Sequence, residues 1–178
     1  MAETTAASGV QRPGAVIPLL TLTLASLALA VHQAPTVSGA LSGWWTGHLS
    51  HWSWSHLGWD VGVFLVLGAV VEARHGRATL AAVVAVGVAL GGAVGGLVHP
   101  ALHAYRGLSA VDTALFAYLL ASSPWLALLA LKLAVEAWLG RALFAGELAP
   151  GVVVAAGAHL GGAVGGVLCA YGARAARS

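Results

Sequence analysis

Apolar residues fall into six long runs along the chain, separated by charged residues or by clusters rich in proline and glycine. Such runs predict membrane-spanning helices, because about 20 apolar residues cross the hydrocarbon core of a bilayer. The predicted spans are 15–31, 57–73, 78–98, 109–121, 125–145 and 152–172. We therefore expect an all-α membrane protein in which six transmembrane helices occupy 15–172. A polar N-terminus would cover 1–14 and a short basic tail 173–178.

The composition supports a membrane protein and limits its chemistry. Of the 178 residues, 59% are hydrophobic and 8% are charged, whereas a soluble domain carries about 25% charged residues. The net charge is only +2 and the arginines are scattered, so we expect the lipid bilayer but no nucleic acid as a partner. The single cysteine, Cys169, excludes an internal disulfide and a multi-cysteine metal site. We expect no cofactor and no metal.

The basic residues predict an orientation. If both ends of the chain lie on one side, five arginines share that side and two lie on the other. The first group is Arg12, Arg74, Arg77, Arg174 and Arg177, and the second is Arg106 and Arg141. The positive-inside rule then makes both termini cytoplasmic in a multi-pass protein of the cell (inner) membrane. Alternatively, residues 16–31 are a cleaved signal peptide, since small residues such as Ala34 follow them.

Tryptophan and histidine gather in the first outer loop, residues 43–59. The loop contains Trp44, Trp45, Trp52, Trp54 and Trp59, with His48, His51 and His56. Because tryptophan prefers the level of the lipid headgroups, this loop is predicted to lie in the membrane interface, where the tryptophans act as an anchor.

The fourth run is too short to cross a bilayer. Its 13 or so residues give roughly 20 Å of helix, against about 30 Å for the hydrocarbon core. We expect this helix to begin at Ser109, about 10 Å below the outer surface. In the sixth run His159 follows Val152 by seven residues, again about 10 Å down. A histidine inside a membrane segment needs a polar partner, and Ser109 is available at the same depth.

Two structural roles compete with a Ser109–His159 pair. Ser109 could cap its helix, because Asp112 completes a Ser-x-x-acid pattern, and His159 could be a structural hydrogen-bonding residue. The glycines after His159 favour the pair, since small residues four apart let helices approach closely. These glycines are Gly161, Gly162, Gly165 and Gly166, and the same GGAVGG sequence occurs at 91–96. Such packing can bring an imidazole within about 3 Å of a hydroxyl.

Three segments resemble motifs of the rhomboid intramembrane serine proteases. GHLSHWSWSHLGWDVGVFLVLGAVVEARHG (47–76) is similar to the rhomboid outer loop and second span, GLSA (107–110) resembles the Gly-x-Ser-Gly nucleophile motif, and AHLGGAVGG (158–166) resembles the signature of the last catalytic helix. The matching positions of the first segment are His51, His56, Asp60, Leu67-Gly68 and Glu72. LKLAVEAWLG (131–140) and VVVAAGAHLGGAVGG (152–166) are also similar to the rhombosortase branch.

The resemblance implies a rhomboid-like six-helix bundle with serine endopeptidase activity. Ser109 would be the nucleophile and His159 the base, with no acid required to complete a triad. The oxyanion and its surroundings would involve His56, Asp60, His51 and the backbone N–H of Leu108 and Ser109. Close helix packing would use Gly107, Gly162 and Gly166.

The resemblance also implies the substrates and the side from which they enter. Rhomboid proteases cleave transmembrane segments, and the rhombosortase branch implies C-terminal tails that contain Gly-Gly and anchor client proteins. The site would open to the outer (periplasmic) face.

The chain departs from the rhomboid pattern at three positions. Ala110 stands where glycine is usual, and Thr113 stands where many rhomboids stack an aromatic ring on the histidine. Asp60 replaces an asparagine that donates toward the oxyanion, so it must be protonated, rotated away or orienting His56. These departures keep open an alternative, a catalytically silent rhomboid-like protein that binds membrane clients.

Two further groups of residues allow other interpretations. Metal or haem binding would use His48, His51, His56, His99 and His103, but Pro100 interrupts a helix there and no cysteine or carboxylate cluster completes a ligand shell. Lys132 and Glu136 are spaced i to i+4 in the fifth run, which predicts a buried ion pair. The alternative is a contact with charged groups of the substrate.

Overall fold

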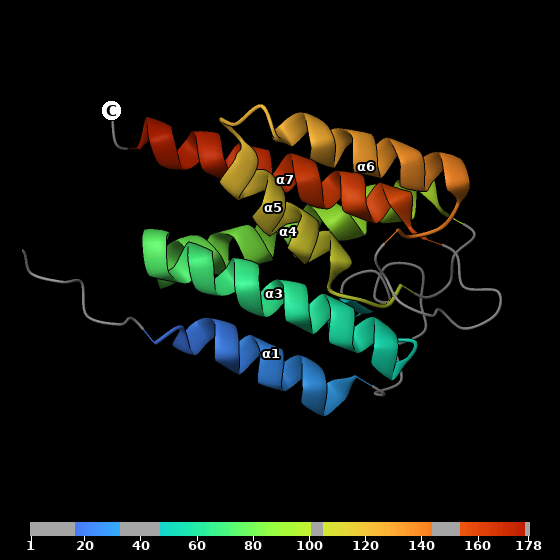
Figure 1. The fold of residues 1–178 in the computed structure, drawn as a ribbon, viewed down its shortest axis with the longest axis horizontal. Helices are drawn as coiled ribbons and strands as arrows, with labels where there is room; N and C mark the ends of the chain where they lie inside the picture. The colour runs from blue at the N-terminus through green and yellow to red at the C-terminus, as the bar shows by residue number, and fades with distance from the viewer. Residues whose placement is uncertain (1–16, 33–46, 101–104, 144–153, 177–178) are drawn as a thin grey trace, which may run out of the picture.

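The computed structural model describes residues 17–32, 47–100, 105–143 and 154–176. These residues form α-helices, one short 3-10 helix and no strand, which confirms the all-α class. The elements are α1 (Leu19–Val31), η1 (Gly47–Leu49), α3 (Trp54–His75), α4 (Arg77–Val98), α5 (Ser109–Leu120), α6 (Leu126–Leu139) and α7 (Ala156–Ala175). Successive helices alternate in direction, so that α1 begins and α7 ends at the same end of the bundle (Figure 1).

The six helices follow the order of the six predicted runs, but some boundaries differ. α5 begins at Ser109, as expected. α3 begins at Trp54 rather than at 57, because the Ser53 hydroxyl accepts the backbone N–H of His56 and caps the helix.

The last two predicted spans need larger corrections. α6 ends at Leu139 and not at 145, because Gly140 adopts a left-handed conformation with φ of 65°. α7 begins at Ala156 rather than at 152 and continues past the predicted boundary at 172 to Ala175.

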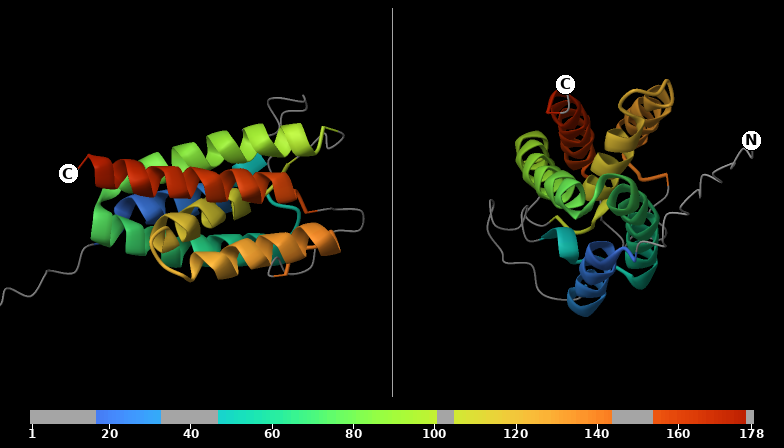
Figure 2. Two further views of the ribbon diagram at one scale, coloured as in Figure 1. Left: turned by 90° about the horizontal axis from the view of Figure 1, so that it is seen from above. Right: turned by 90° about the vertical axis from the view of Figure 1, so that its left-hand side faces the viewer.

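The short helix α5 lies at the centre of the bundle, and the end-on view of Figure 2 shows it surrounded by other helices. Most of its residues are buried. They are Ala110, Val111, Asp112, Thr113, Ala114, Leu115, Ala117 and Tyr118. Residues of the first turn of α5 are therefore held by neighbours on several sides.

α7 packs against α5 and α4 through its glycines. A Cβ added at Gly162 would collide with the carbonyl oxygen of Ala110, and one at Gly166 with that of Ala114, both on α5. On the α4 side, a Cβ at Gly161 would meet the backbone at Leu90. The close packing expected at Gly162 and Gly166 is thus present, and it brings the backbones of three helices together.

Glu72 holds α1 against α3. Its carboxylate accepts hydrogen bonds from the backbone N–H of Leu20 at 3.0 Å and of Thr21 at 2.8 Å, and from the Thr21 hydroxyl at 2.8 Å. Arg77 Nε donates to Glu72 Oε1 at 3.1 Å. Glu72 is only 3% exposed, so its charge is compensated by donors rather than by water.

Among the described residues, α3 and α4 have the length and apolar composition of helices that cross a membrane, with 22 residues each. α1 and α5 are apolar but have 13 and 12 residues, and 12 residues span only about 18 Å. The six-span arrangement therefore stays a prediction. Residues 1–14 and 177–178 lie outside the described residues, as does Ala34.

Two tryptophans of the segment 43–59 are exposed in α3. Trp54 is 64% exposed and Trp59 is 50% exposed, and their contact with lipid headgroups stays a prediction. Trp44 and Trp45 lie outside the described residues.

Candidate active site

Ser109 is the first residue of α5, and its hydroxyl points to a histidine of α7. Its Oγ lies 2.8 Å from His159 Nε2. Leu108 precedes it at the N-cap, and no side chain caps the helix. The alternative in which Ser109 merely caps α5 is therefore not observed. Ser109 and His159, which the sequence predicts as a pair, are 50 residues apart in the chain and meet in the structure.

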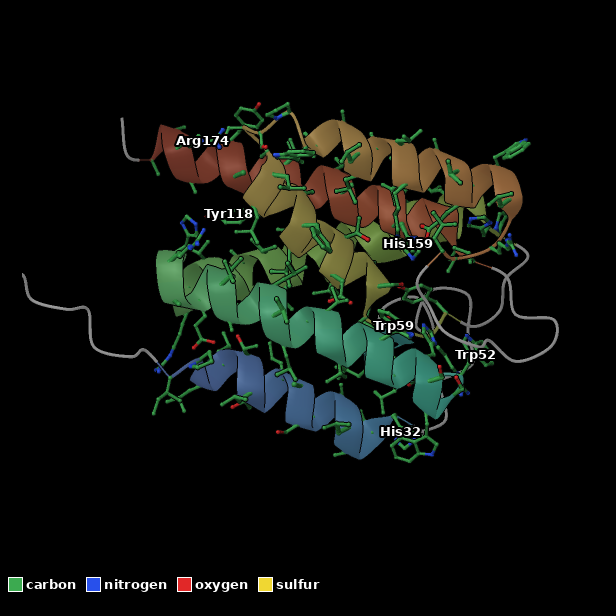
Figure 3. The ribbon with its side chains drawn as sticks, viewed as in Figure 1. His32, Trp52, Trp59, Tyr118, His159 and Arg174 are labelled. Atoms are coloured by element: carbon green, nitrogen blue, oxygen red, sulfur yellow. The ribbon has the colours of Figure 1, made fainter. Side chains whose placement is uncertain are left out.

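His159 lies in the first turn of α7 and is 5% exposed. Figure 3 shows it toward the end of the bundle that contains Trp52, whereas Tyr118 and Arg174 lie toward the opposite end. α7 starts at Ala156 and not at 152, so His159 lies nearer the start of its helix than predicted. Ser109 and His159 meet because both occupy the first turns of helices that start at the same end of the bundle.

The other ring nitrogen of His159 contacts a carboxylate from α6. His159 Nδ1 lies 3.2 Å from Glu136 Oε2. The same oxygen lies 2.8 Å from Lys132 Nζ, and Glu136 Oε1 accepts the backbone N–H of Leu143 at 2.9 Å. The predicted Lys132–Glu136 pair is present. The sequence did not predict a carboxylate beside His159, and the fold provides one because it brings α6 and α7 together.

Tyr105 is a second neighbour that sequence reasoning missed. Its hydroxyl lies 3.3 Å from Ser109 Oγ and accepts the backbone N–H of Ala110 at 3.3 Å. Burial raises the pKa of the Tyr105 hydroxyl, so this group stays protonated and can donate to Ser109. Its position four residues before the serine is the only sequence signal that could have indicated it.

The ring of Tyr105 packs edge-to-face on His48, with centroids 4.8 Å apart. Burial lowers the pKa of His48 to about 4, so this imidazole is neutral at physiological pH and packs as an uncharged ring.

Asp60 lies between two imidazoles of the predicted oxyanion region. Its Oδ2 is 3.2 Å from His51 Nε2 and 3.4 Å from His56 Nε2. Of the three possibilities for this aspartate, the contact with His56 fits an orienting role. The roles of His51, His56 and Asp60 in catalysis stay predictions.

Gly107 differs from its expected role in close helix packing, because it lies in the loop before α5. It has a positive φ of 129°, and a Cβ there would lie 2.8 Å from Asp60 Oδ2 and 2.9 Å from His56 Nε2. Glycine is required at this position so that the backbone can pass beside the two side chains. Leu108, which follows, is buried and leads directly into Ser109.

Thr113 does not take the place of an aromatic ring on the histidine. Its hydroxyl donates to the carbonyl oxygen of Ser109 at 2.6 Å, within its own helix. The polar support of the His159 ring comes from Glu136 instead.

In the part of the chain that the structure describes, no group of three His, Cys, Asp or Glu side chains could hold a metal ion. His99 Nε2 accepts the backbone N–H of Gly157 at 3.2 Å. His103 lies outside the described residues.

A hydroxyl, an imidazole and a carboxylate in hydrogen-bonded sequence form the kind of arrangement that serine hydrolases use. The rhomboid domain family model matches residues 38–176, so the chain belongs to the rhomboid family. This family in general comprises intramembrane serine proteases, and membership together with the apolar helices indicates a membrane protein. A search of curated proteins gave no match.

Proposed function

We propose that this protein is an intramembrane serine endopeptidase in which Ser109 is the nucleophile and His159 the general base. The observation that supports this proposal is the 2.8 Å hydrogen bond between Ser109 Oγ and His159 Nε2 in a chain of the rhomboid family. That distance allows the imidazole to accept the hydroxyl proton as the oxygen attacks.

The proposed reaction proceeds through an acyl-enzyme. Ser109 Oγ attacks the carbonyl carbon of the scissile peptide bond, and its proton passes to His159 Nε2. When the tetrahedral intermediate collapses, the C–N bond breaks and His159 gives the proton to the leaving amine. A water molecule then attacks the ester carbon and passes a proton to His159. Collapse releases the carboxylic acid product, and the proton returns to Ser109 Oγ.

The oxyanion donors that we propose are the backbone N–H groups of Ser109 and Leu108 and the imidazole of His56. The N–H of Ser109 is in the first turn of α5, where helix geometry provides no acceptor within the helix. One such donor typically lowers the barrier by about 3 kcal/mol.

We further propose that the six helices span the cell (inner) membrane with both termini cytoplasmic and the site open to the outer side. The arginine distribution supports this orientation. Helix directions agree with it, since α1 begins and α7 ends at one end of the bundle (Figure 1). His159 lies toward the other end, where Trp52 is found (Figure 3).

The proposed substrates are transmembrane segments or C-terminal tail anchors of client proteins. The resemblance of residues 131–140 and 152–166 to the rhombosortase branch supports tails that contain Gly-Gly as the specific class. Such tails are suitable because glycine loosens helical structure, and a peptide bond must leave the helix to reach Ser109.

A fluorophosphonate probe tests the proposal in membranes. The probe should label the wild-type protein at Ser109 and should not label the Ser109→Ala and His159→Ala variants. Ser122→Ala is the matched control, because Ser122 bonds Arg174 at the opposite end of the bundle and its loss should leave labelling unchanged. Absence of any adduct in folded wild-type protein would favour a client-binding protein without activity. Co-expression with a client that has a Gly-Gly tail should give cleavage that both active-site variants abolish.

A further inference from the structure

We infer that Glu136 is a positioning residue that orients His159 for catalysis, and that Lys132 and the Leu143 backbone hold Glu136 in place for this role. The inference rests on the proposed function, since it concerns the same nucleophile and base. It extends a serine–histidine pair to a line of four side chains, Ser109, His159, Glu136 and Lys132.

The carboxylate of Glu136 is fixed by donors on both of its oxygens. Oε1 accepts the N–H of Leu143 at 2.9 Å, and Oε2 lies 2.8 Å from Lys132 Nζ and 3.2 Å from His159 Nδ1. Glu136 is 1% exposed, so it has no access to water as an alternative partner. A buried carboxylate held by three donors can rotate only by breaking hydrogen bonds that nothing replaces.

The end of α6 builds this arrangement. Gly140 in the left-handed conformation closes the helix, and its N–H bonds the carbonyl oxygen of Glu136. The chain then turns back so that the N–H of Leu143 reaches the side chain of the same glutamate. Glu136 is thus held through both its backbone and its side chain in the last turn of α6.

The carboxylate determines which nitrogen of His159 carries the proton. Since a carboxylate accepts hydrogen bonds, the neutral imidazole places its N–H at Nδ1, facing Glu136. Its Nε2 then presents a lone pair to the Ser109 hydroxyl 2.8 Å away. When Nε2 takes the serine proton, the resulting imidazolium lies beside an anion, which stabilises it.

Glu136 holds the His159 ring, and Thr113 of α5 does not. Thr113 points its hydroxyl at the Ser109 carbonyl oxygen, 2.6 Å away, and so does not hold the ring of His159. Lys132 completes the site, because its ammonium compensates the charge that Glu136 would otherwise carry unpaired in a buried position. This assigns Lys132 to the enzyme's own carboxylate rather than to charged groups of the substrate.

The test measures the rate at which a fluorophosphonate inactivates the full-length protein in membranes at neutral pH. Inactivation forms the Ser109 Oγ–phosphorus bond, releases fluoride and moves the serine proton to His159. We expect Glu136→Gln to lower the rate by at least about 100-fold at neutral pH. Glu136→Asp should recover part of the rate.

Glu72→Gln is the matched control, because it makes the same chemical change in a carboxylate that is 3% exposed and holds α1 instead of the histidine. Its inactivation rate per folded molecule should equal that of the wild type. Lys132→Met should lower the rate less than Glu136→Gln does, since the carboxylate remains beside His159.

The outcomes separate this inference from the proposed function. If the wild type reacts and Glu136→Gln reacts equally fast, the positioning role is overturned and the protease remains. If folded wild type does not react, the proposed function fails, and the inference fails with it.

Proton NMR of the wild-type protein tests the inference a second time without any substitution. The His159 Nδ1–H should give a strongly deshielded resonance that identifies a bond to a carboxylate, and its absence would overturn the inference.

Discussion

Adding a single methyl group at Gly162 should separate the proposed catalytic pair. In Gly162→Ala, the new Cβ would lie 2.9 Å from the carbonyl carbon of Ala110 and closer still to its oxygen. Both atoms belong to the backbone of α5, so neither can rotate away. Ordinary carbon contacts begin at about 3.4 Å, and α7 must therefore withdraw from α5 by at least roughly 0.5 Å.

This displacement acts where the two reactive groups meet. Ala110 follows Ser109 directly, and Gly162 lies about one turn after His159 on the same helix. A hydrogen bond of 2.8 Å between Ser109 Oγ and His159 Nε2 would lengthen to more than about 3.3 Å, beyond the usual range for a hydroxyl donor. Misplacement of reacting groups by up to 1 Å costs as much as about 100-fold, so we expect the labelling rate to fall by roughly 10- to 100-fold.

The assay is the rate of fluorophosphonate labelling per folded molecule, with Gly172→Ala as the control. Gly172 is on the same helix, and a Cβ there would meet nothing within 4 Å. Because alanine favours a helix over glycine by about 1 kcal/mol, this control should be at least as stable as the wild type and label equally fast. Folded Gly162→Ala that labels at the wild-type rate would refute the idea that this helix contact sets the distance between serine and histidine.

Two further predictions concern neighbours of the site. Tyr105→Phe should reduce labelling of Ser109 about 10-fold, because it removes a hydroxyl 3.3 Å from Ser109 Oγ and leaves the Ala110 N–H without its acceptor; an unchanged rate would contradict this role. His48 has a pKa of about 4 in the folded protein, against 6.5 as its ordinary value, so its contribution to stability is complete above pH 6.5 and is lost as the pH falls toward 4. The contribution amounts to roughly 3 kcal/mol. Thermal unfolding in detergent should occur at lower temperature at pH 4.5 than at pH 7.5, and a His48→Gln variant with the same pH dependence as the wild type would contradict this assignment.

The sequence predicted the helices well where hydropathy changes sharply and poorly where it does not. α5 begins at Ser109 as expected because Arg106-Gly107 interrupts the apolar run just before it. For α6 the sequence predicts an end at 145, because Ala142 and Leu143 are apolar and hydropathy does not distinguish a helical residue from one in a turn. Gly140 ends the helix through its backbone conformation, with φ of 65°, which a hydropathy profile does not measure.

In the candidate site, too, contacts within one helix could be predicted from the sequence, whereas contacts between distant segments could not. Lys132 and Glu136 are four residues apart, and the period of the helix alone predicts that they meet. The contact of Glu136 with His159 spans 23 residues and two helices, so no spacing rule reveals it. Gly107 shows the same limit, because its closeness to Asp60 and His56 depends on how the loop crosses α3 rather than on a helical pattern.

Two carboxylates near the candidate nucleophile have different surroundings, because Glu136 is held by hydrogen bonds whereas Asp60 Oδ2 lies near imidazole nitrogens without a hydrogen bond. An unpaired anion close to a developing oxyanion would raise the barrier, most strongly where water is excluded. Asp60 lies 3.2 Å from His51, and Glu136 lies 2.8 Å from Lys132. Placing Glu136 on the far side of the imidazole, at Nδ1, also directs its charge to the imidazolium that forms and away from the oxyanion at Ser109. The charge of Glu136 is therefore compatible with formation of an oxyanion at Ser109.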